Sequence, residues 1–220
     1  MKKILSSVFL LSLLSNCVYT KNIVMSDIDS QRLNGKTIAT VFRDKSDMTL
    51  KTPFHAAMLG GFLVHWNMVS QGNKIVKENN IEDPAFLISQ KLKDSLVKNY
   101  KLEALSINNQ KEVSSYNVDK ISNSYKEFVD YVIDVRNLNW GISYVSGDIS
   151  NYAITYSSEF KLIDVKNKMV VAENSCTYTP YKKYPKNIIL EDNAKILKQE
   201  FLGAANACAK MFIESNLKLK

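Results

Sequence analysis

The side chains with catalytic or metal-binding chemistry are few in this sequence. Its two histidines, His55 and His65, stand ten positions apart in an apolar stretch, and this spacing does not bring them to one face of a helix. The sequence has no Gly-x-Ser-x-Gly elbow, His-Glu-x-x-His pair, Cys-x-x-Cys pair or phosphate-binding glycine-rich loop. The acidic pairs at 82–83 and 191–192 begin predicted helices, where the helix dipole accounts for them. We therefore predict no catalytic residue, no metal site and no cofactor.

Cys17 offers covalent chemistry of a different kind. A positively charged start at residues 1–3 precedes an apolar run over residues 4–14, which is typical of an export signal and shorter than the roughly 20 residues of a membrane span. The segment Leu14-Ser15-Asn16-Cys17 then resembles the lipobox of bacterial lipoproteins. This resemblance implies cleavage before Cys17 and a thioether to diacylglycerol. Asn16 stands where Gly, Ala or Ser is usual, and the alternative is a plain secretory signal cut nearby. Both interpretations export the protein.

The lipobox divides the chain into a lipoprotein signal peptide over residues 1–16, a lipidated tether over residues 17–34 and one domain over residues 35–220. Several acyl chains give stable anchoring, so membrane lipid is a predicted partner through Cys17. In lipoproteins an aspartate after the cysteine tends to retain the protein at the inner membrane. Val18 stands here, which favours the outer membrane, facing the periplasm.

The charge of the mature chain is mildly positive. The precursor has 29 basic and 22 acidic residues, and the signal removes Lys2 and Lys3 and no acid, so the balance becomes 27 − 22 = +5. No basic run is long enough to predict nucleic-acid binding. The surplus favours proximity to anionic lipid headgroups or to an anionic surface polymer.

Setting Cys17 aside as the anchor leaves Cys176 and Cys208. An even pair in an oxidising compartment predicts one disulfide. Cys176 lies on the predicted inward side of a strand, and Cys208 lies in the apolar stripe of the final predicted helix. The alternative is two separate buried thiols.

Periodicity predicts an α+β domain. Residues 36–43 and 101–107 are typical of short strands, and Asp83 and Pro84 are typical of the start of a helix that reaches residue 100. Residues 108–126 look like a loop. Alternating apolar residues over 129–178 predict a three-stranded antiparallel meander with a β-bulge near Arg136-Asn137, and residues 192–216 predict a last helix. We expect an antiparallel sheet, this meander plus one or two N-terminal strands, covered on one face by two long helices.

Two further segments carry alternatives. Residues 55–69 are apolar almost throughout and predict a buried helix or helical hairpin, or else a surface that inserts into lipid or docks on a partner. That surface would comprise Leu59, Gly60, Gly61, Phe62 and Trp66. Residues 178–186 mix tyrosines with lysines and predict a solvated loop, or else a binding loop for a sugar or phosphate-bearing polymer. That loop would use Tyr181, Lys182, Lys183 and Tyr184.

The order of these segments is similar to that of small bacterial envelope lipoproteins of unestablished activity and, loosely, to auxiliary lipoproteins of envelope transport machines. The resemblance rests on layout, with Asp83-Pro84, Cys176 and Cys208 as its sharp points, and it implies no catalytic residue. We therefore predict a lipid-anchored envelope protein with a non-enzymatic binding or assembly role, whose partner is an envelope protein or a surface polymer. The alternatives are an envelope-polymer hydrolase and a carrier of an apolar ligand.

Overall fold

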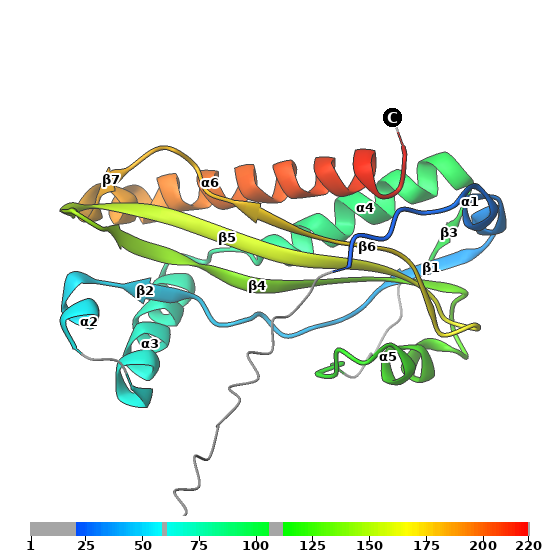
Figure 1. The fold of residues 1–220 in the computed structure, drawn as a ribbon, viewed down its shortest axis with the longest axis horizontal. Helices are drawn as coiled ribbons and strands as arrows, with labels where there is room; N and C mark the ends of the chain where they lie inside the picture. The colour runs from blue at the N-terminus through cyan, green and yellow to red at the C-terminus, as the bar shows by residue number, and fades with distance from the viewer. Residues whose placement is uncertain (1–20, 59–60, 106–111, 220) are drawn as a thin grey trace, which may run out of the picture.

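The computed structural model describes residues 21–58, 61–105 and 112–219, so Cys17 and the predicted signal lie outside the described residues. Figure 1 shows a long sheet with helices on both sides. In chain order the elements are α1 (Asp27–Leu33), β1 (Thr37–Thr40), β2 (Thr49–Lys51), α2 (Pro53–Ala57), α3 (Phe62–Glu78), α4 (Pro84–Tyr100), β3 (Glu103–Ala104), α5 (Val118–Tyr125), β4 (Tyr131–Val145), β5 (Asp148–Asp164), β6 (Met169–Tyr178), β7 (Tyr184–Pro185) and α6 (Lys186–Ser215).

The predicted meander forms the centre of the sheet. Strands β4, β5 and β6 pair antiparallel, and the register shifts between Asn137 and Asn139, beside the predicted bulge. The whole sheet has the order β3-β1-β4-β5-β6, with β2 beside β4 and β7 beside β5. The prediction of an antiparallel sheet was wrong for the N-terminal strands. Strand β1 runs parallel to β3 and β4, and β2 runs parallel to β4, because α4 and the loops between them return the chain to the same end.

Helices α4 and α6 lie together on one face of the sheet, as predicted (Figure 1). Asp83 caps α4 by accepting a hydrogen bond from the backbone N–H of Ala85, and Pro84 occupies the first turn. The apolar side chains predicted for the middle strand all face this core. They are Tyr152, Ile154, Tyr156, Phe160 and Leu162. Aromatic contacts join the layers, with Trp140 against Phe201 and Phe160 against Phe212.

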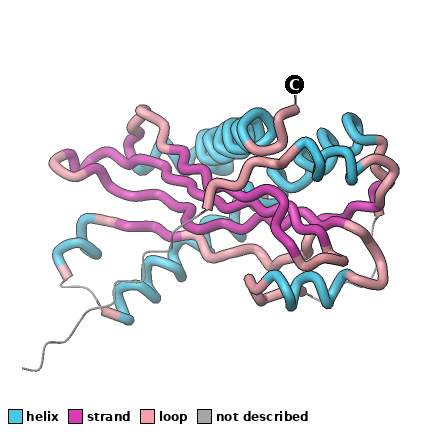
Figure 2. Tube along the Cα trace, turned by 45° about the vertical axis from the view of Figure 1, so that its right-hand side comes forward, coloured by secondary structure: helices cyan, strands magenta, loops and turns pink. Residues whose placement is uncertain are grey.

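The other face of the sheet is also partly covered, contrary to the expectation of one covered face. Helix α5 forms inside the segment predicted as a loop, and its Ile121 and Tyr125 pack with Val132 and Ile163 in a second, smaller core. Helices α2 and α3 stand on the same side at the far end of the sheet (Figure 1), and Figure 2 shows helices on both sides of the strands from a second angle. The helix predicted within residues 55–69 forms as α3, which extends to Glu78 and lies on the side of the sheet opposite the two long helices.

Part of the segment predicted as a tether over residues 17–34 packs against the sheet and the end of α6. Ile23 forms an antiparallel bridge with Glu173 of β6, and the Met25 N–H donates to the Asn216 carbonyl. Helix α1 follows, with Leu33 fully buried. Residues 23–33 therefore belong to the domain, because backbone hydrogen bonds and burial hold them to β6 and α6.

Helix α6 begins earlier than predicted and contains a break. Residues Glu191, Asp192, Asn193 and Ala194 leave helical geometry, and the last three have φ of 50°, 57° and 54°. Asp and Asn tolerate this left-handed conformation better than other side chains. The long helical part after the break carries Cys208, which is fully buried and bonded to Cys176 of β6 with their Cα atoms 5.5 Å apart.

Candidate functional site

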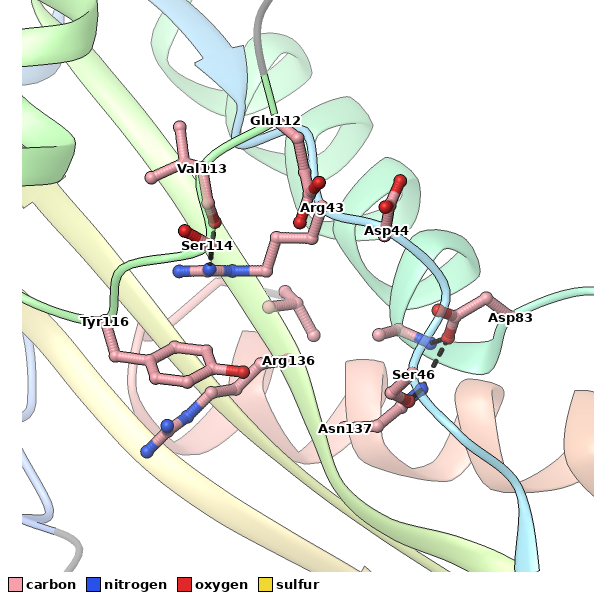
Figure 3. Close-up of a pocket in the computed structure, with 12 residues that line it drawn as sticks. Arg43, Asp44, Ser46, Asp83, Glu112, Val113, Ser114, Tyr116, Arg136 and Asn137 are labelled. Atoms are coloured by element: carbon pink, nitrogen blue, oxygen red, sulfur yellow. Dashed lines mark hydrogen bonds between the residues drawn. The ribbon is translucent and has the colours of Figure 1, made fainter. Parts of the chain in front are cut away.

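A pocket of 140 Å³ with mainly polar lining residues lies beside β4, between the N-terminus of α4 and the segments 43–46 and 112–116 (Figure 3). Arg43 enters it from the segment after β1, Arg136 and Asn137 from β4, and Asp83 from the N-terminus of α4. The segment 112–116 closes another side. These residues are far apart in the sequence, and the sheet brings them together.

Arg43 is the most constrained cation of the pocket. Its Nε and Nη2 donate to the two carboxylate oxygens of Asp134 at 2.6 and 2.7 Å, and its remaining hydrogens reach the carbonyls of Val113 and Ser115 at 2.6 and 3.2 Å. Burial lowers the pKa of Arg43, but the hydrogen bonds and charge of Asp134 outweigh it and raise the pKa above its ordinary value. Arg43 therefore stays charged and ties segment 112–116 to the sheet.

Tyr116 lies between two guanidinium groups. Its ring centroid is 4.7 Å from Cζ of Arg43 and 4.2 Å from Cζ of Arg136. Arg136 donates from Nε to Glu159 at 2.6 Å, so its charge also has a partner. Lys161 extends this network across the sheet, 3.7 Å from Glu159 and 3.4 Å from a carboxylate of β6. Cations and carboxylates alternate, which stabilises the polar face of the three long strands.

The carboxyl groups of the pocket have raised pKa values, but they already have hydrogen-bond partners within the protein. Burial raises the pKa of Asp83, although Oδ1 accepts from Asn137 at 2.7 Å and from Ala85 at 2.8 Å. The hydrogen bond with Asp44 raises the pKa of the exposed Glu112. A raised carboxyl pKa is a mark of general acids, yet Asp83 also caps a helix and fixes Asn137. The arrangement therefore explains Asp83 as a structural joint between α4 and β4.

A second feature is the projection formed by α2 and the first half of α3. Its large apolar side chains point to solvent, and Phe62, Leu63 and Trp66 are 80%, 77% and 60% exposed. Phe54 and Met58 are exposed beside them. We call the exposed side chains Phe54, Met58, Phe62, Leu63 and Trp66 the apolar projection.

The apolar projection stands on an ordered base. His55 is buried, and its Nδ1 accepts from the Thr52 N–H at 3.2 Å while Nε2 contacts Oδ1 of Asn67 at 2.7 Å. This contact links α2 to α3. The buried residues of α3 all lie in its second half, where the Cβ of an alanine at Gly72 would meet the Met48 carbonyl at 2.0 Å. Only glycine permits so close an approach of α3 to β2.

The expectation that residues 55–69 are buried was wrong for most of the segment. Phe62 and Trp66 of the alternative surface lie together on α3, and Gly61 precedes the helix with φ of 129°, which only glycine adopts readily. Leu59 and Gly60 lie outside the described residues. His65 is exposed and His55 is buried, so the two rings do not form one site.

The four residues predicted as a tyrosine–lysine binding loop lie in two different environments. Tyr181, Lys182 and Lys183 are exposed, whereas Tyr184 lies in β7 and donates to Glu200 at 2.6 Å. Burial, followed by this hydrogen bond, raises the pKa of Tyr184 to about 12. Tyr184 therefore fastens the loop to α6.

Sequence reasoning missed the grouping of Arg43, Tyr116 and Arg136. A partial signal exists, because Asp134 and Arg136 alternate with apolar residues of β4 and so belong to its polar face. Nothing in the local sequence connects them to residues 43 and 116. Within the described ranges, no group of three or more His, Cys, Asp or Glu residues could hold a metal ion, and no helix is long and apolar enough to cross a membrane.

Neither a protein-family model nor a curated protein matches the sequence. Solved structures with similar shape include the PelC dodecamer from Paraburkholderia phytofirmans, with a TM-score of 0.38, 10% identity and coverage of 90% of this chain and 97% of that one. Protein XCC0632 from Xanthomonas campestris has a TM-score of 0.39 and 13% identity, and the match covers 84% of this chain and 88% of that one. Lipoprotein GNA1162 from Neisseria meningitidis has a TM-score of 0.28 and 15% identity, and the match covers 78% of this chain and 98% of that one. All three TM-scores are below 0.5, so the likeness assigns no function to this chain.

Proposed function

We propose that this protein is a lipid-anchored component of the cell envelope with a non-enzymatic binding or assembly role, exerted through the apolar projection. The observation that carries the proposal is the concentration of five exposed, large apolar side chains over residues 54–66. Contiguous exposed apolar surface on a globular protein marks an interaction site. The ordered base around His55 and Gly72 holds this surface in place before any partner binds.

The anchor supports the same role. Cys17 is the predicted lipidation site, and the disulfide of Cys176 with Cys208 suits an oxidising compartment outside the cytoplasm. Ile23 is already fixed to β6, so only six peptide steps separate it from Cys17. Such a segment spans at most about 20 Å. The domain would therefore remain close to its membrane, which Val18 suggests is the outer membrane.

The pocket of Arg43 favours a structural role over hydrolysis. Arg43 and Arg136 are engaged by Asp134 and Glu159, and Asp83 is engaged by Asn137 and the helix it caps. A hydrolase requires an acid or base that can reach a substrate in the site. The charges of this pocket instead connect β1, β4 and segment 112–116 to one another.

The anchor is tested by replacing Cys17 with serine and growing cells with an alkyne-bearing fatty acid. We expect the wild-type protein to carry the label and to sediment with membranes, and Cys17→Ser to lose the label. Ser15→Ala is the matched control, because it keeps a small residue between Leu14 and Cys17 of the lipobox. Full labelling of Cys17→Ser would contradict the proposal.

The binding role is tested by photo-cross-linking in cells. A benzoylphenylalanine at position 66 should form adducts, and the same group at position 86 should not. Trp66 and Phe86 are 60% and 59% exposed, but Phe86 belongs to α4 on the opposite side of the sheet. Equal adduct formation at the two positions, or none at position 66, would refute the projection as the binding surface.

A further inference from the structure

Building on the proposed function, we infer that the apolar projection is a membrane-contacting element and that its partner is the lipid bilayer in which Cys17 is anchored. Five features support this identification: side-chain chemistry, charge, the tether, the geometry of the sheet and the rigidity of the base. Each is independent of the similar solved structures.

The side chains suit the boundary between lipid headgroups and acyl chains. Phe54, Phe62, Leu63 and Met58 can bury apolar surface, and Trp66 combines an apolar ring with an N–H group that can remain in the polar layer. Trp is enriched at such interfaces in membrane proteins. Amphipathic helices that bind membranes reach about 5–10 Å into this boundary, which one helical end can do without spanning the bilayer.

The charge around the apolar projection suits an anionic headgroup layer. From Met48 to Lys77 the sequence contains no Asp or Glu, although 22 acidic residues occur elsewhere in the chain. Lys51 in this interval is exposed. An approaching membrane surface therefore meets no negative side chain from the segment. The absence of acidic residues from this segment distinguishes it from the segment of Phe86, which follows Glu82 and Asp83 closely in the sequence.

The tether brings the membrane within reach. Ile23 pairs with Glu173, which is opposite Lys161, and Lys161 is opposite Asp134 of β4. Strand β2, which leads into α2, begins its pairing with β4 at Gly141. The seven residues from 134 to 141 correspond to roughly 24 Å along the strand. The tether lets Cys17 lie up to about 20 Å from Ile23, and the separation between Ile23 and β2 can run along the membrane plane, so one bilayer surface can accommodate both the acylated Cys17 and the projection.

The direction of the projection is consistent with this placement. Helices α2 and α3 leave the sheet on the side opposite α4 and α6, and the tip of α3 extends away from the strands (Figure 1). The close packing of Gly72 on Met48 and the contact of His55 with Asn67 fix that direction. Little conformational entropy is then lost when the tip enters the interface, which favours binding.

The chain contains its own reporter for this inference. Of its two tryptophans, Trp66 is exposed, whereas Trp140 is 1% exposed and donates from Nε1 to the Ser46 carbonyl. We would purify the full lipidated protein and reconstitute it into vesicles of phosphatidylethanolamine and phosphatidylglycerol. Vesicles with brominated acyl chains quench only tryptophans that contact lipid.

We expect a blue shift of the emission in vesicles and a loss of intensity when the lipids are brominated. Trp66→Phe should abolish both effects, because Trp140 is shielded by the fold. The pair Phe62→Ser and Leu63→Ser should diminish the quenching of Trp66. The matched control is Phe86→Ser with Leu202→Ser, which removes two exposed apolar side chains from α4 and α6 and should leave quenching unchanged.

An anchored protein whose Trp66 emission is the same in brominated and natural lipids would overturn the inference while leaving the lipid anchor intact. Cross-links from position 66 to a second copy or to another protein, without lipid adducts, would overturn it in favour of a protein interface. Loss of anchoring itself would appear separately, as an unlabelled Cys17, and would count against the proposed function.

Discussion

Removal of the disulfide is expected to destabilise the fold by a calculable amount. We consider Cys176→Ala combined with Cys208→Ala. The bridge spans a sequence separation of 32 residues, and closing a loop of that length in the unfolded chain corresponds to about 3.7 kcal/mol near 25 °C in the chain-entropy treatment. Most domains have only about 5–15 kcal/mol of total stability. The double variant should therefore fold but unfold at a clearly lower urea concentration.

The structural position of the bridge makes the measurement specific. It ties β6 to α6, and the same helix carries Phe212 against Phe160 and Phe201 against Trp140. In urea unfolding, the oxidised protein should have the highest free energy of unfolding. The reduced protein and the double variant should both have lower values, equal to each other. Trp140 emission follows the core directly, because the indole lies between sheet and helix.

Two results would refute this reasoning. One is a free energy of unfolding that changes by less than about 1 kcal/mol on removal of both cysteines, which would mean that the loop is not constrained. The other is the detection of two free thiols in the unreduced mature protein by mass spectrometry.

Three further experiments test other parts of the structure. Gly72→Ala places a Cβ 2.0 Å from the Met48 carbonyl, so we expect a loss of roughly 1–3 kcal/mol in urea unfolding, and an unchanged value would contradict the close packing. Asp134→Ala leaves Arg43 buried without its carboxylate and should cost roughly 3–5 kcal/mol, part of which Arg43→Met should restore in the double variant. Burial raises the pKa of the Asp83 carboxyl above its ordinary value of 3.8, so the protonated carboxyl stabilises the fold below that pH. This stabilisation is lost as the pH rises through the pKa of Asp83 in the folded state. Asp83→Asn lacks this loss, and its melting temperature relative to wild type should increase from about pH 3 to about pH 6, whereas a constant difference would argue against a buried carboxyl.

Local sequence patterns predicted the elements whose cause is local. Asp83 and Pro84 marked the start of α4 because capping and the missing N–H of proline act within one helical turn. Alternation of apolar residues marked β5 because neighbouring side chains of a strand point to opposite faces. The cysteine count predicted the bond between Cys176 and Cys208 once Cys17 was assigned to lipid.

Interactions between distant segments decided what the sequence left open or misassigned. Residues 55–69 looked like core because they are apolar, but hydropathy does not specify whether a face meets the sheet or solvent. The packing of Gly72 on Met48 turned the first half of α3 outward. Similarly, α5 forms within the predicted loop because its Ile121 and Tyr125 pack into a second core on the sheet.

The sequence by itself predicted an export signal and a candidate lipidation site at Cys17, and it determined much of the set of strands and helices, since these depend on composition and short-range periodicity. Only the tertiary structure decided that Arg43, Tyr116 and Arg136 form one network, because ion pairs and ring contacts depend on which strands become neighbours. It also decided that Trp66 faces outward. Side-chain type is written in the sequence, whereas exposure is a property of the packed chain.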